Sequence, residues 1–119
     1  MLISVGAESL ENKRYTVTTT LTIDVSKLSI DGNGATLDFS QASSSCQCIK
    51  LISTATTPYL NNGHFIKSLE IVGKGKTYTQ TAFICDSDIE ARATSHLDFE
   101  KLNIHEFGTG FNFKRYCYM

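Results

Sequence analysis

The chain has 119 residues, which suits a single domain, and its 41% hydrophobic and 19% charged residues are a globular balance rather than a disordered one. Its formal net charge is -1 and it has no Lys/Arg-rich block, so neither nucleic acid nor an anionic membrane is expected as a partner. No apolar run reaches the roughly 20 residues of a membrane-spanning helix, and residues 1–10 lack the basic start and apolar centre of a secretion signal.

The first part of the chain is rich in β-branched residues. Residues 15–25, YTVTTTLTIDV, fit a pleated surface and predict sheet. We expect a bend near Ser26 and then a strand that contains Leu28 and Ile30. Residues 32–34, Gly-Asn-Gly, are a turn signal, and residues 35–39 resume the two-residue alternation of a strand.

The remaining strands are separated by polar loops. Residues 41–47 and 54–63 read as loops, and strands are expected over residues 48–53, 65–71, 82–85, 97–104 and 111–113. Residues 89–94, IEARAT, are the one plausible helical turn, although it is too short to be stable without packing.

One pattern, Leu-x-Ile-x-x-x-Gly, occurs three times. The copies start at Leu28, Leu69 and Leu102, so the first two are 41 residues apart (69 − 28) and the last two 33 apart (102 − 69). Each copy places two apolar side chains on one face of a strand before a glycine that permits a sharp turn. Recurrence over a few tens of residues is typical of a solenoid. The unequal spacing fits a right-handed single-stranded parallel β-helix, in which one corner varies in length.

With these motifs the chain resembles the pectate-lyase-like superfamily of right-handed parallel β-helices, and within it the tailspike and tail-fibre proteins of bacteriophages. The resemblance covers residues 15–119 and rests on LTIDVSKLSIDGNGATLDF, IKSLEIVGKGKT and FEKLNIHEFGTGFNF. It implies an all-β solenoid of few coils, incomplete at the end of this sequence, with residues 1–14 as an N-terminal lead-in segment. It also implies a homotrimer that binds host-surface polysaccharide, found in the virion tail or, before assembly, in the host cytoplasm.

The four cysteines are expected to be free thiols. Cys46 and Cys48 are too close to favour pairing with each other, and Cys85 lies in an apolar run where a thiol behaves as a small buried hydrophobe. The alternative is a zinc site, but the sequence lacks two-residue-spaced cysteine pairs on both sides of such a site. Its candidate ligands are Cys46, Cys48, His64, His96 and His105.

Asp86 and Asp88 are the best local pair of carboxylates. On an extended strand they share a face at about 7 Å, which suits an inverting glycosidase or a cation site. The competing interpretation is a solvated turn that caps the segment at Ile89. Asp31, Asn33 and Asp38 are at or beside the first glycine turn, where such side chains commonly hydrogen-bond to their own backbone, so a structural role is expected for them. His105 and Glu106 are adjacent on a strand and therefore point to opposite faces.

Sugar binding is the other candidate chemistry. Tyr59 and Tyr78 can stack on sugar rings, while Lys74 and Lys76 can attract acidic glycans. The Gly-x-Gly segments do not predict a phosphate loop, because no helix is expected to follow either of them.

The leading hypothesis is a non-catalytic tailspike-like module that presents or supports a polysaccharide-binding surface, without cofactor or metal. The alternatives are a polysaccharide lyase or glycoside hydrolase of the same superfamily, and a structural remnant that binds no sugar.

Overall fold

The computed structural model describes residues 6–55, 64–87, 94–95, 97–115 and 117–118. Over these residues it contains strands, turns and bends, and no helix. The strands are β1 (Gly6–Ser9), β2 (Arg14–Thr16), β3 (Leu21–Asp24), β4 (Leu28–Asp38), β5 (Gln47–Ile52), β6 (His64–Val72), β7 (Thr81–Cys85), β8 (Thr94–Ser95), β9 (Leu97–His105), β10 (Thr109–Phe113) and β11 (Cys117–Tyr118). The all-β prediction is therefore confirmed for the described residues.

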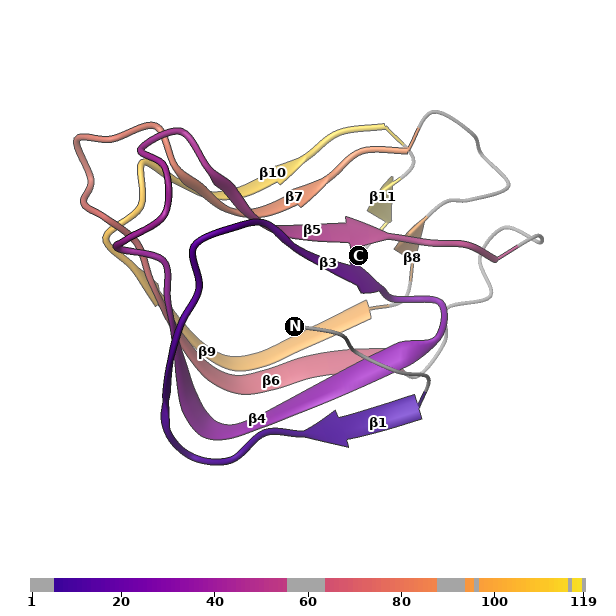
Figure 1. The fold of residues 1–119 in the computed structure, drawn as a ribbon. Coiled ribbons are helices and arrows are strands. Elements are labelled where there is room, and N and C mark those ends of the chain that lie inside the picture. The colour runs from indigo at the N-terminus through magenta and orange to yellow at the C-terminus, as the bar shows by residue number, and fades with distance from the viewer. Residues whose placement is uncertain (1–5, 56–63, 88–93, 96, 116, 119) are drawn as a thin grey trace.

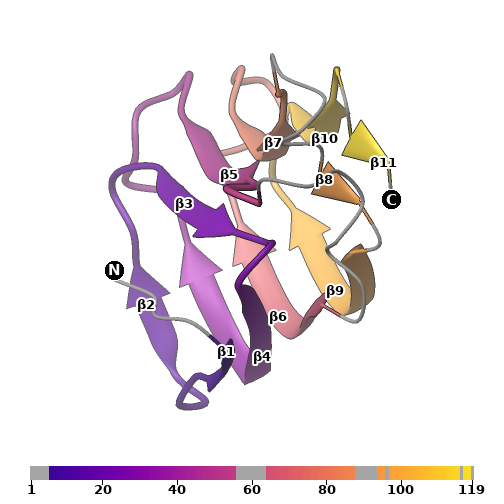
Figure 2. The ribbon, with the colours of Figure 1, turned by 90° about the vertical axis from the view of Figure 1, so that its right-hand side faces the viewer.

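The strands form parallel sheets between which the chain alternates. One sheet has the order β1-β4-β6-β9, with β2 also paired to β4, and a second has the order β10-β7-β5-β3 (Figure 1). A third, small sheet joins β11 to β8. Parallel neighbours cannot be joined by a tight hairpin, so the chain passes through the opposite sheet between them. Figure 2 shows the strands of both sheets following one another along the molecule.

The core lies between the two larger sheets, which face each other in Figure 1. Alternate residues of each strand point inward, as the period of two requires. Phe39 and Phe83 are among the largest fully buried side chains. The inward residues of the strands include Leu21, Ile23, Ala35, Leu37, Ile49, Leu51, Ile66, Leu69, Ile71, Phe83 and Cys85.

The three Leu-x-Ile motifs do not all stack. Leu69 pairs with Leu102 and Ile71 with Ile104, as the repeat predicts. The first copy was aligned wrongly, because Ala35 and Leu37 are the β4 residues that pair with Leu69 and Ile71. Leu28 and Ile30 lie on an earlier part of β4, and Ile30 pairs with Ile66. The register shifts between Asp31 and Ala35, where the Gly-Asn-Gly segment adds residues within the strand instead of ending it.

The long strands β4, β6 and β9 bend at equivalent positions, as Figure 1 shows. The residue before the paired row Ala35, Leu69 and Leu102 has a positive φ in each strand: 80° at Gly34, 58° at Ser68 and 52° at Lys101. A left-handed backbone suits glycine and costs about 1–2 kcal/mol in other residues. The turn signal at residues 32–34 was therefore read correctly as a change of direction, whereas Ser68 and Lys101 gave no such signal.

Two other predictions, the lead-in segment and the helical turn, include residues that the structure does not describe. Within the expected lead-in segment 1–14, β1 pairs in register with β4, and Arg14 begins β2. Residues 89–93 of the expected helical turn lie outside the described residues, and Thr94 belongs to β8.

The prediction of four free thiols is wrong for two of them. Cys85 and Cys117 form a disulfide, whereas Cys46 and Cys48 are free. The bond arises because β10 pairs with β7, with Phe113 beside Cys85, so the chain that follows β10 passes close to the end of β7. The two Cα atoms are 6.4 Å apart although the cysteines are 32 residues apart in sequence, a proximity that their spacing does not reveal.

Candidate functional site

Three loops lie side by side where the chain leaves one large sheet for the other. We call residues 39–46, 73–80 and 106–108 the corner loops; they lead from β4 to β5, from β6 to β7 and from β9 to β10. Backbone hydrogen bonds join them in sequence: Thr79 N donates to Ser44 O, and Gly75 N donates to Glu106 O.

Gln80 fixes these loops from inside. Its side chain is fully buried, and its Nε2 donates to Phe39 O at 3.1 Å and to Ser43 O at 3.0 Å. Its Oε1 accepts from Lys74 N at 2.7 Å. Every polar atom of the side chain is thus used to hold backbone groups, which makes the corner loops a rigid support.

The middle corner loop presents three of the predicted sugar-binding residues. Lys74, Lys76 and Tyr78 are all exposed, and Tyr78 is 45% exposed. The Lys74 ammonium lies 5.9 Å from the centroid of the Tyr78 ring. An aromatic ring beside the Lys74 ammonium, with the exposed Lys76 on the same loop, can combine ring stacking with attraction of carboxylate or phosphate groups. Tyr59, the fourth predicted residue, lies outside the described residues.

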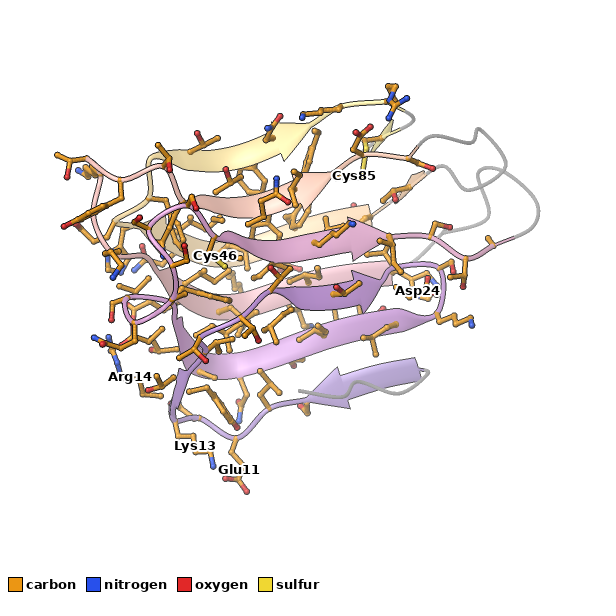
Figure 3. All side chains as sticks on the ribbon, turned by 45° about the horizontal axis from the view of Figure 1, so that its top comes forward. Glu11, Lys13, Arg14, Asp24, Cys46 and Cys85 are labelled. Carbon is orange, nitrogen blue, oxygen red and sulfur yellow. A yellow bond between two sulfur atoms is a disulfide. The ribbon has the colours of Figure 1, made fainter. Side chains whose placement is uncertain are left out.

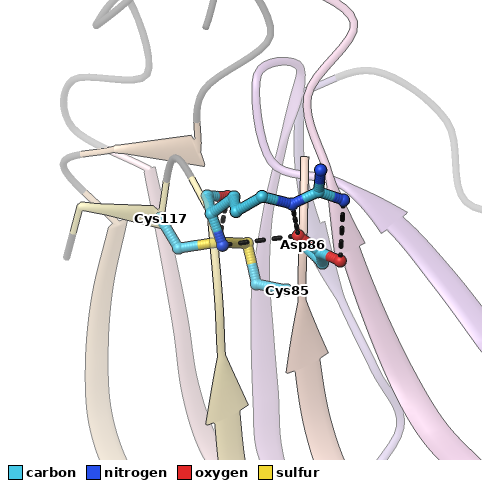
Figure 4. The surroundings of a disulfide bond; sticks show 4 residues. Cys85, Asp86 and Cys117 are labelled. Carbon is cyan, nitrogen blue, oxygen red and sulfur yellow. Dashed lines mark hydrogen bonds and ion pairs between the residues drawn. A yellow bond between two sulfur atoms is a disulfide. The ribbon is translucent and has the colours of Figure 1, made fainter. Parts of the chain in front are cut away.

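Asp86 lies at the other end of β7 and pairs with Arg115. The Asp86 carboxylate accepts from Arg115 Nε at 3.1 Å, from Nη2 at 3.3 Å and from the backbone N at 3.3 Å, beside the disulfide (Figure 4). The hydrogen bond from the Arg115 side chain lowers the pKa of Asp86 below its usual range. Asp88, its predicted partner, lies outside the described residues.

A row of polar side chains across the first sheet was missed by the sequence analysis. Glu70 accepts a hydrogen bond from Thr36 Oγ1 at 2.8 Å, and its second oxygen lies 3.0 Å from His105 Nε2. Hydrogen bonds from Thr36 and then from His105 lower the pKa of Glu70. The sequence analysis considered His105 only with its neighbour Glu106 and set that pair aside, whereas its structural partner, Glu70, is 35 residues away.

The same sheet carries a second ion pair nearer its first edge. Arg14 Nε and Nη2 both lie 2.9 Å from Asp38 Oδ2, and Arg14 lies on the side of the corner loops in Figure 3, opposite Asp24. Burial raises the pKa of Asp38, but hydrogen bonds from Ser40 and Arg14 outweigh it, so the net shift is downward. Asp38 thus has a structural role, as the sequence indicated.

The candidate ligands of the alternative zinc site do not come together among the described residues. His64 Nδ1 lies 3.2 Å from Ser29 Oγ, His105 is bound to Glu70, and His96 lies outside the described residues. Across the described ranges, no three His, Cys, Asp or Glu side chains gather as a metal site would require.

Within the part of the chain that the structure describes, no helix has the length and hydropathy to cross a bilayer. Comparison with known proteins finds no matching family model, no matching curated protein and no matching solved structure.

Proposed function

We propose that the chain is a segment of a right-handed, single-stranded parallel β-helix. The support is the way the chain alternates between two parallel sheets while paired strands keep their register over three successive layers, as in Ala35, Leu69 and Leu102. Apolar side chains from each layer continue one core, and that is how a solenoid is stabilised.

The proposed role is that of a phage or prophage tailspike-like module that binds host-surface polysaccharide. The observation that carries it is the exposed pair Lys74 and Tyr78 on a loop fixed by the buried Gln80. A rigid support lowers the entropy lost on binding, because the side chains that contact the ligand are already in place. The family resemblance of the sequence supplies the ligand class and the expected homotrimer.

A polysaccharide lyase or glycoside hydrolase has less support from the described carboxylates. A general acid at neutral pH needs a raised pKa, yet the pKa values of Asp38, Glu70 and Asp86 are all lowered by hydrogen bonds that hold the carboxylate in its charged form. Each of these groups is engaged with a basic side chain and thereby stabilises contacts between strands.

The disulfide favours a location outside a reducing compartment. Disulfides persist in oxidising surroundings, such as the surface of a virion, and are rare in the cytosol. The bond between Cys85 and Cys117 therefore suits a tail protein after its release better than the same chain before assembly.

The test is binding of purified capsular polysaccharide and lipopolysaccharide to the folded protein, measured by biolayer interferometry. We expect binding to acidic glycans to fall about tenfold or more in the Lys74→Gln, Lys76→Gln double variant, because two exposed ammonium groups are lost. Tyr78→Ala should weaken binding to neutral and acidic glycans alike, because it removes the stacking surface.

Lys13→Gln is the matched control, since Lys13 is an exposed lysine near the first edge of the sheet. It should bind like the parent protein. No binding by a well-folded sample would contradict the proposed function. New reducing ends or unsaturated uronates that disappear in Asp86→Ala would favour the enzyme instead.

A further inference from the structure

The last coil leaves apolar side chains uncovered at one end of the stack. β9 and β10 are the last described strands of the two large sheets, and Figure 2 shows them at the end opposite β1 and β2. Phe111 is 46% exposed and borders a groove of about 380 Å³. The other residues that line the groove are Phe99, Glu100, Leu102 and Ile104. At the first end of the stack, by contrast, Leu21 and Ile23 of β3 are buried. Of the two ends, as far as the structure describes them, the last one exposes more apolar surface.

The bend of β9 changes which of its residues point inward. Lys101 has a left-handed φ of 52°, and the inward positions change there from odd to even residue numbers. Leu97 and Phe99 point inward before it. Leu102 and Ile104 point inward after it. Read from either end, this part of the strand therefore gives the same order of inward and outward side chains.

This order makes the free edge of β9 complementary to the same edge of a second copy. A two-fold axis between Glu100 and Lys101 would pair the two strands antiparallel, with inward residues opposite inward ones. The opposite residues would be Leu97 and Ile104, Phe99 and Leu102, Asp98 and Asn103, and Glu100 and Lys101. A strand with a regular alternation would have its faces reversed in this register, so the fit depends on the bend.

The charges of the outward side chains favour the same arrangement. Asp31, Lys67 and Glu100 occupy one row across β4, β6 and β9, so the charges alternate along it. Opposite charges on neighbouring strands stabilise a sheet, whereas like charges destabilise it. Glu100 is the last residue of the row and is exposed, as is Lys101. The two-fold axis places Lys101 of the second copy beside Glu100, and it does so at two points in each pair of chains.

β10 approaches the same axis from the other sheet. Phe111 is the middle residue of this five-residue strand. Its ring centroid lies 5.4 Å from that of Phe99, which is next to Glu100 and so close to the axis. The axis would therefore bring the exposed Phe111 ring close to its own copy, and the two rings together would cover both grooves. Burial of aromatic surface is a common feature of homodimer interfaces.

The size of this end and the elements beside it limit the contact. The molecule extends 37 × 28 × 22 Å, so its smallest cross-section offers roughly 500–600 Å² per copy, at the lower limit for a specific interface. The edge before Leu97 is already occupied, because β11 pairs with β8. After His105 the chain turns into the third corner loop, where Glu106 has a φ of 64°. The pairing is thus confined to residues 97–104.

We propose that two copies of the chain associate end to end through antiparallel pairing of their β9 strands about a two-fold axis. The partner is a second copy because the faces and the charges of this edge are complementary to themselves. An interface of this size predicts a dimer that forms at micromolar concentrations. The contact leaves the middle corner loop uncovered, so it does not depend on the proposed polysaccharide binding.

Sedimentation velocity at increasing protein concentration tests the proposal, with Glu100→Lys and Lys101→Glu as the variants. The parent chain should approach twice the mass of one chain as the concentration rises. Each variant alone places like charges opposite each other at two points, so its dissociation constant should rise about tenfold or more. An equimolar mixture of the two variants should dimerise again, because the mixed pair restores opposite charges at both points. The double variant Glu100→Lys, Lys101→Glu should dimerise like the parent for the same reason.

Two aromatic variants give the matched control. Phe111→Ser should weaken the dimer, because it removes the ring at the axis. Tyr78→Ser should leave it unchanged, since Tyr78 is similarly exposed, at 45%, but lies on the middle corner loop. Circular dichroism reports whether each variant keeps its fold, and the charge variants decide the matter if Phe111→Ser does not fold. A parent chain that stays monomeric, an oligomer other than a dimer, or a mixture of the charge variants that fails to dimerise would overturn the proposal.

Discussion

Two glycines near the end of the chain differ sharply in what surrounds them. A Cβ added at Gly108 would collide with the carbonyl oxygen of Tyr78, whereas a Cβ added at Gly110 would have no heavy atom within 4 Å. Gly108 therefore lets the last corner loop approach the backbone of the middle one. Its role is close packing, since its φ lies outside the left-handed region.

Gly108→Ala should lower the free energy of unfolding by about 1–3 kcal/mol, because the new methyl group forces two backbone segments apart. Gly110→Ala is the control and should be neutral or stabilising by up to about 1 kcal/mol, because it restricts the unfolded chain without a clash. Urea denaturation followed by circular dichroism measures both. Equal midpoints for the two variants would show that the corner loops are not in close contact.

One buried side chain, that of Gln80, ties the first corner loop to the middle one. Gln80 connects Phe39 and Ser43 of the first corner loop to Lys74 of its own loop, and its backbone O accepts from Thr109 N beyond the third. The buried amide thus adds to the backbone hydrogen bonds that join the corner loops, such as the one from Thr79 N to Ser44 O.

Gln80→Leu should lower the free energy of unfolding by about 2–3 kcal/mol, because it takes away the hydrogen-bond partner of the Lys74 N–H and one of the two hydrogen bonds to each of the Phe39 and Ser43 carbonyl groups. Gln47→Leu is a matched control, since Gln47 is exposed at the start of β5. Chemical denaturation should place the Gln47 variant close to the parent. A Gln80 variant with the parent's midpoint would contradict the role given to this amide.

The strands and their inward faces could be predicted from sequence because both depend on neighbours two residues apart. Residues 82–85 and 111–113 were expected to be strands and lie in β7 and β10. The register could not be predicted, because the choice between Leu28 and Ala35 as the partner of Leu69 depends on contacts more than 30 residues apart.

The same limit applies to the candidate site. Lys74 and Tyr78 are four residues apart on one loop, so their proximity was open to prediction. Glu70 and His105, and the two bonded cysteines, come together only through the stacking of distant strands. The left-handed residues Ser68 and Lys101 carry no local signal either, because the surrounding sheet imposes their conformation.

Across the whole molecule, most contacts between elements join strands that are neighbours in a sheet, such as β4 with β6 and β6 with β9. The disulfide is an exception, because it adds a covalent connection between β7 and β11. It closes a loop that contains β8, β9 and β10, and so it limits the freedom of that part of the chain in the unfolded state.

Reduction of the disulfide should lower the free energy of unfolding by about 3–4 kcal/mol, the value expected for a loop of this length. Urea denaturation with and without a phosphine reductant measures the change, and Cys117→Ser should reproduce it without reductant. Cys46→Ser is the control, since Cys46 is a free thiol. Identical stability with and without reductant would contradict a contribution of the bond to folding.

The bond also determines how a mechanical force would travel through the protein. Tension applied at Tyr118 passes through the two sulfur atoms of Cys117 and Cys85 into β7, whose neighbours on both sides are β5 and β10. The segment between the two cysteines then lies outside the path that carries the tension. In a pulling experiment, the fully extended oxidised chain should accordingly be shorter than the reduced chain by the contour length of the segment between the two cysteines.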